Sequence, residues 1–60
     1  MTLDMVKAVI ERASVGRTPQ TIKSSVGLSF PEVNYIIEQF RRGQNAKQIT
    51  ETMNKKGFKL

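Results

Sequence analysis

The chain contains no cysteine and no histidine. Without cysteine, neither a disulfide nor a zinc–thiolate site can stabilise the fold. Without histidine, the commonest metal ligand and general base at neutral pH is missing as well. A site for a hard cation needs several carboxylates together, whereas the acidic residues stand singly, at Asp4, Glu11, Glu32, Glu38 and Glu51. These absences argue against an enzyme, and we expect no cofactor, no metal and no small-molecule substrate.

Long apolar runs are also absent, and none approaches the roughly 20 residues with which a helix spans a bilayer. Charged residues interrupt the apolar stretch at the N-terminus, at Asp4, Lys7 and Glu11. The sequence therefore lacks the profile of a secretory signal peptide. We expect a cytoplasmic protein without a membrane partner.

The chain is short and basic, with 60 residues and a formal net charge of +5. Its length predicts a single domain, 1–60, that buries only about 60% of the surface its unfolded form exposes. We therefore expect a homodimer to add stability. Ten lysines and arginines against five acidic residues predict attraction to a polyanion such as nucleic acid. The same charge also serves solubility alone, so composition leaves both interpretations open.

Apolar residues recur at spacings of three and four, which predicts an all-α, compact four-helix domain. The expected helices cover about 3–14, 19–26, 30–42 and 46–56. Their starts carry capping residues and their ends carry glycines. The expected N-caps are Thr2, Thr18, Ser29 and Asn45, and the terminating glycines are Gly16, Gly27, Gly43 and Gly57. Ser29 with Glu32, and Asn45 with Gln48, have the spacing of a capping box.

The same spacings predict which residues face the core. The expected inward residues are Leu3, Val6, Ile10, Ala13, Ile22, Val26, Leu28, Val33, Ile36, Ile37, Phe40, Ala46, Ile49 and Met53. Two apolar edges are alternatives for a homodimer surface: Met1, Met5 and Val9 on the first helix, or Ile49, Met53 and Phe58 on the fourth. On the outer side of the third helix, Glu38 and Arg42 are spaced for an ion pair.

The segment PQTIKSSVGLSFPEVNYIIE, residues 19–38, resembles the helix-turn-helix of bacterial and phage transcription regulators. In that motif two helices cross through a short turn, and the crossing requires apolar residues at fixed positions. The matching residues are Ile22, Val26, Gly27, Leu28, Val33 and Ile36. Lys23 departs from the pattern, because the family usually has a small residue there. No strand pair follows the third helix, so a non-winged helix-turn-helix is expected.

The resemblance implies that the third helix lies in the major groove of DNA, with its N-terminal part nearest the bases. The expected base contacts are Ser29, Phe30, Pro31, Asn34, Tyr35 and Glu38. Asn34 is the strongest candidate, because its amide pairs bidentately with adenine. The expected phosphate contacts are Arg17, Thr18, Gln20, Thr21, Lys23, Arg41 and Arg42.

These expectations describe a sequence-specific double-stranded DNA-binding protein, a small phage- or prophage-type transcriptional regulator associated with the nucleoid. It would repress by occupancy, as a homodimer on an inverted repeat. Two alternatives stay open. One is a recombination accessory factor that bends DNA. The other is a helical protein-interaction module, an adaptor or inhibitor that docks through a face containing Phe30 and Tyr35.

Overall fold

The computed structural model describes residues 1–56, which fold into four α-helices without a strand in that range. The helices are α1 (Leu3–Ser14), α2 (Pro19–Val26), α3 (Phe30–Arg41) and α4 (Ala46–Lys56). The prediction of a compact all-α domain with four helices is confirmed. The expected bounds hold except that α3 ends one residue earlier, where Arg42 is its C-cap. The expected helix end at Gly57 lies outside the described residues.

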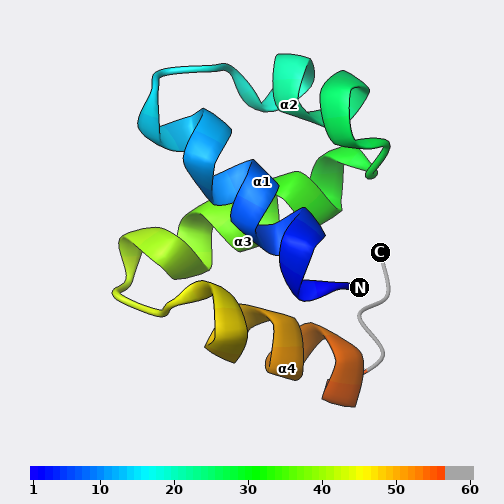
Figure 1. Ribbon diagram of the computed structural model, residues 1–60, viewed down its shortest axis with the longest axis vertical. Helices are drawn as coiled ribbons and strands as arrows, with labels where there is room; N and C mark the ends of the chain where they lie inside the picture. Colours follow the sequence, from blue (N-terminus) through cyan, green and yellow to red (C-terminus); the bar gives the residue numbers. More distant parts are fainter. Residues whose placement is uncertain (57–60) are drawn as a thin grey trace.

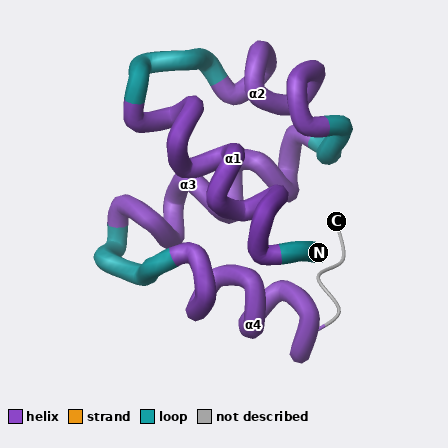
Figure 2. Tube along the Cα trace, in the orientation of Figure 1, coloured by secondary structure: helices purple, strands orange, loops and turns teal. Residues whose placement is uncertain are grey.

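Two helices form the centre of the domain, and the other two cover opposite ends of it. α1 and α3 each contact all three other helices, whereas α2 and α4 do not contact each other. In Figure 1, α2 lies at the top and α4 at the bottom, with α1 and α3 between them. The loops, drawn in teal in Figure 2, are short and cover 15–18, 27–29 and 42–45.

Local hydrogen bonds explain why the helices begin where they do. Ser29 Oγ accepts the N–H of Glu32 at 3.4 Å, and the Glu32 carboxylate accepts the N–H of Ser29 at 3.0 Å. Asn45 and Gln48 make the same reciprocal pair at 2.8 and 3.0 Å. Each pair satisfies backbone donors that have no partner within the first turn of a helix. The predicted capping boxes are confirmed.

The turn between α2 and α3 depends on one glycine. Gly27 has φ 74°, in the left-handed region that glycine adopts without steric penalty, and its N–H donates to the Lys23 carbonyl at 2.9 Å. Leu28 follows and is buried. Ser29 then caps α3. Three residues therefore end one helix, contribute to the core and start the next.

All four helices contribute to a single apolar core. Its buried residues are Val6, Val9, Ile22, Leu28, Val33, Ile36, Ile49 and Met53. Two expected core residues are wrong, because Leu3 is 37% exposed and Phe40 is 43% exposed. Both lie in a terminal turn of their helix, beyond the region that the neighbouring helices cover.

The two expected dimer surfaces are largely used within the monomer. Val9 was expected on the outer edge of α1 but is fully buried, because the central α1 is covered by three helices. Met1 and Met5 pack partly against the same core. Ile49 and Met53 of α4 are buried as well, and Phe58 lies outside the described residues. A homodimer stays a prediction.

Candidate nucleic-acid interface

α3 turns one chemical face inward and a different one outward. Val33 and Ile36 are fully buried, whereas Pro31, Asn34 and Glu38 are exposed. At about 100° per residue, these two sets lie on opposite sides of the helix. The helix therefore presents a polar stripe away from the core, continued at its C-terminal end by the exposed Arg41. We call Pro31, Asn34, Glu38 and Arg41 the outward face of α3.

A shallow hollow of about 490 Å³ lies beside this face. Asn34, Glu38 and Arg41 line it from α3, and Arg17 lines it from the loop between α1 and α2. Residues far apart in the sequence thus bring two cationic side chains next to an amide and a carboxylate. Two expected base contacts and two expected phosphate contacts lie together here. Their roles in binding are still predictions.

Tyr35 and Arg42 do not line the hollow beside Asn34. They line a different hollow, between α3 and α4, together with Gln39 and Lys55 among others. Tyr35 is half-buried and packs against the core. Phe30 and Tyr35 therefore differ in exposure, and a docking face that contains both stays a prediction. Phe30 is 43% exposed at the start of α3, but Tyr35 is partly covered because it lies on the side of α3 that faces α4.

Ser29 is occupied by the capping box rather than free for a ligand. Its Oγ accepts the N–H of Glu32 and lies 2.8 Å from the Glu32 carboxylate oxygen, to which its hydroxyl donates. Glu32 acts as the capping partner that its spacing predicted. The Ser29 hydroxyl proton is used within the capping box, so a base contact in which Ser29 donates would require breaking its bond to Glu32.

The predicted ion pair on the outer side of α3 is confirmed. Arg42 Nη2 lies 2.9 Å from Glu38 Oε1, and both side chains are more than half exposed. Exposed pairs at this spacing contribute only about 0.3–0.5 kcal/mol to stability. The pair matters more for position, because it holds the Glu38 carboxylate at the edge of the outward face.

The other expected phosphate contacts lie on the surface of α2. Gln20 and Lys23 are exposed, and the hydroxyls of Thr18 and Thr21 are 2.9 Å apart at the start of the helix. Thr18 Oγ1 also accepts the N–H of Thr21, so it is the predicted N-cap. Lys23 is exposed, so its long side chain does not obstruct the packing of α2 on α3.

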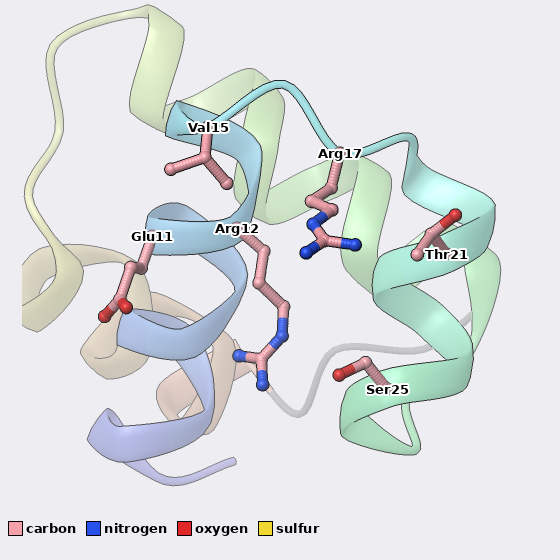
Figure 3. A pocket seen from close by; sticks show the side chains of 6 residues that line it. All are labelled: Glu11, Arg12, Val15, Arg17, Thr21 and Ser25. Carbon is pink, nitrogen blue, oxygen red and sulfur yellow. The ribbon is translucent and has the colours of Figure 1, made fainter.

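Two polar residues that sequence reasoning missed lie between α1 and α2. Arg12 and Ser25 line a pocket of about 360 Å³ together with Arg17 and Thr21. Figure 3 shows the guanidinium groups of Arg12 and Arg17 directed into the space between the two helices. The four-residue spacing of Thr21 and Ser25 places both side chains on one side of α2. That spacing was the only available signal, because the position of Arg12 depends on how α1 packs.

Within residues 1–56, no three acidic, histidine or cysteine side chains gather as a metal site would require. No helix in the same range combines the length and apolar character needed to cross a bilayer. No protein-family model, no curated protein and no solved structure matches this chain. Any assignment of function therefore depends on the geometry described above.

Proposed function

We propose that this protein binds double-stranded DNA sequence-specifically through the outward face of α3, with α2 and α3 acting as a non-winged helix-turn-helix. The observation that carries the proposal is that Arg41 of α3 and Arg17 of the loop after α1, which also lines the pocket between α1 and α2, both line the hollow that Asn34 and Glu38 share. Cations from two separate elements thus flank hydrogen-bonding side chains on one exposed helix. This combination suits a DNA duplex, which carries negative charge on its backbone phosphates and presents base edges in its grooves.

The proposed binding mode places α3 in the major groove. Asn34, in the second turn, would pair with the N6 and N7 of adenine, and Glu38, one turn later, would accept from the amino group of cytosine. Each well-formed bidentate contact contributes about 1–3 kcal/mol of discrimination between bases. Pro31 and the exposed part of Phe30 offer apolar contacts to thymine methyl groups.

Phosphate contacts would then hold the helix in register. Arg17 and Arg41 flank the outward face, and exposed residues at the start of α2 extend the contact surface. The net charge of +5 supports attraction to the duplex over a longer range. Because each neutralised phosphate releases counterions, binding should weaken steeply as salt rises.

In a cell such a protein would act as a small transcriptional regulator of phage or prophage type, repressing by occupancy of its site. Two copies on an inverted repeat would place their α3 helices about 34 Å apart, one turn of DNA. A recombination accessory factor that bends DNA would use the same face of α3. Bending assays with circularly permuted fragments would separate these two roles.

The test begins with selection of bound duplexes from random sequence, followed by mobility-shift titrations of the selected site and of an unrelated duplex. Asn34→Ala should lower affinity for the selected site by about 5- to 150-fold, which corresponds to a contact of about 1–3 kcal/mol. Binding to the unrelated duplex should change little, because phosphate contacts dominate it.

Asn54→Ala is the matched control, since it removes an exposed asparagine from α4. Among residues 1–56 the Asn54 amide donates only to the Met1 carbonyl, at 2.9 Å, so its loss should leave DNA affinity unchanged once folding is verified by circular dichroism. If the wild-type protein retards no duplex at low salt, DNA binding is wrong. If Asn34→Ala and Asn54→Ala behave alike, the assignment of Asn34 as a base contact is wrong.

A protein-interaction module is the second candidate, and the exposure of Phe30 is the observation that favours it. An exposed aromatic side chain is a common anchor at protein interfaces. The partial burial of Tyr35 reduces the apolar area that such a face would offer. On this alternative, Phe30→Ala would abolish partner binding while Asn34→Ala would leave it intact.

A further inference from the structure

The pocket between α1 and α2 lies outside the outward face of α3 and contains an unusual set of polar groups. Arg12 lines it from α1, Arg17 from the following loop, and Thr21 and Ser25 from α2. Glu11 also belongs to the lining, but in Figure 3 its carboxylate points away from the space between the helices. Within the described residues, neither arginine forms an ion pair.

Arg12 is held in place by its own helix. It is half-buried, and its Nη1 donates to the Ala8 carbonyl at 3.3 Å. A guanidinium has five N–H donors in a planar fork, so this bond leaves others directed toward α2. The backbone N–H of Arg17 donates to the Arg12 carbonyl at 3.1 Å, but within the described residues the Arg17 guanidinium makes no hydrogen bond or ion pair. Two cationic groups therefore share one pocket without an acidic partner to neutralise them.

The two neighbouring serines of α2 differ in their hydrogen bonds, and this difference leaves the Ser25 hydroxyl available to a ligand. Ser24 Oγ donates to the Gln20 carbonyl of its own helix at 3.3 Å. Ser25 makes no such bond in the described structure, and Figure 3 shows its hydroxyl directed toward the space that the arginines enter. The Thr21 hydroxyl is paired with Thr18 but retains further hydrogen-bonding capacity. The Ser25 hydroxyl on the α2 side therefore faces the guanidinium groups that enter from α1 and the following loop (Figure 3).

We propose that this pocket binds a phosphoryl group between the guanidinium groups of Arg12 and Arg17 and the hydroxyl of Ser25. Guanidinium forks match the oxygens of phosphate bidentately, and charge-assisted bonds of this kind are stronger than neutral ones. A phosphate would also neutralise the two like charges that the fold brings together. The phosphoryl group has two sources, a free phosphorylated small molecule or the DNA backbone. Neither Arg12 nor Ser25 belongs to the proposed base-reading site.

The first arm of the test uses inorganic phosphate and no DNA. Phosphate titrated into the ¹⁵N-labelled full chain, against chloride at equal ionic strength, should shift the Arg12 and Arg17 Nε–H and the Ser25 amide resonances saturably. Arg12→Gln should weaken this binding by roughly tenfold or more, as expected for a lost bond to a charged group. Ser25→Ala should weaken it by about two- to tenfold, because one neutral donor is lost.

Lys47→Gln is the matched control, since it removes one exposed positive charge from α4, which does not line the pocket. It should leave phosphate affinity within about twofold, as expected for a distant surface charge. The proposal is overturned if phosphate causes no saturable shifts at these three residues. It is overturned equally if Lys47→Gln weakens binding as much as Arg12→Gln, because the effect would then come from net charge alone.

The second arm adds a duplex and separates the two sources. If the backbone supplies the phosphate, the duplex shifts the same resonances, and Arg12→Gln makes the negative slope of log affinity against log salt shallower by about 0.9. If the duplex binds elsewhere or not at all while phosphate still occupies the pocket, the ligand is a free phosphorylated molecule. The pocket is then supported even where the DNA proposal has failed.

Discussion

The two faces of α3 differ in burial, in chemistry and in what a substitution should do. Val33 and Ile36 have no solvent-exposed surface and join all four helices into one core. On the opposite face, Asn34 and Glu38 are exposed, and neither contributes to the core. One helix thus carries the stability of the domain on one side and its proposed binding chemistry on the other. Changes to the first face should unfold the protein, and changes to the second should leave it folded.

The largest effect on stability is expected from Ile36→Ala. Truncating a fully buried isoleucine costs about 2–5 kcal/mol in the free energy of unfolding. A domain of this size has only about 3–9 kcal/mol in total, at roughly 0.05–0.15 kcal/mol per residue. Urea denaturation followed by circular dichroism at 222 nm (a standard helix signal) should show a partly or fully unfolded variant. Ile36→Val, expected to cost about 0.5–1.5 kcal/mol, is the graded control, and equal midpoints for both variants would contradict the burial described here.

An intermediate effect on stability is expected from Gly27→Ala, in the turn that orients α3. Gly27 has φ 74°, and a Cβ added there would meet nothing within 4 Å. The cost of Gly27→Ala is therefore a backbone cost alone, about 1–2 kcal/mol for an L-residue in the left-handed region. Gly27→Asn should cost less, because asparagine tolerates this conformation better. Thermal unfolding of both variants tests this order, and an alanine variant as stable as wild type would show that the turn does not need a positive φ.

The smallest effect on stability is expected from Glu38→Gln, on the outward face. This change breaks the exposed ion pair with Arg42 and should lower the free energy of unfolding by about 0.5 kcal/mol or less. The same variant should relax the preference at one base position of the selected site, since the carboxylate acceptor becomes an amide. A large loss of stability would break the division between the two faces. An unchanged base preference would remove Glu38 from the proposed contacts.

Helix bounds and caps were predictable because they depend on residues a few positions apart. The pairs Ser29–Glu32 and Asn45–Gln48, and the positive φ of Gly27, follow from local chemistry that the sequence states directly. Burial was harder to predict, because it depends on how many neighbours a helix has. α1 contacts three helices, so Val9 is covered although the sequence pattern assigned it to an outer edge.

In the candidate sites, too, some features follow from local sequence and others depend on how the helices pack. The exposed positions of Asn34 and Glu38 follow from the helical period, once Val33 and Ile36 are placed in the core. The hollow that Arg17 and Arg41 share, and the pocket that Arg12 and Ser25 share, arise from packing between elements that are separate in the sequence. No spacing rule predicts such contacts, so the pocket between α1 and α2 became visible only in the folded structure.

The most direct test of the proposed binding face is a map of amide and side-chain chemical shifts on adding a selected duplex to the ¹⁵N-labelled protein. The account predicts the largest shifts at Asn34, Glu38 and Arg41 and a slightly smaller shift at Arg17. It predicts little change along the exposed side of α4. Shifts confined to α4, or none on α3 at low salt, would contradict it.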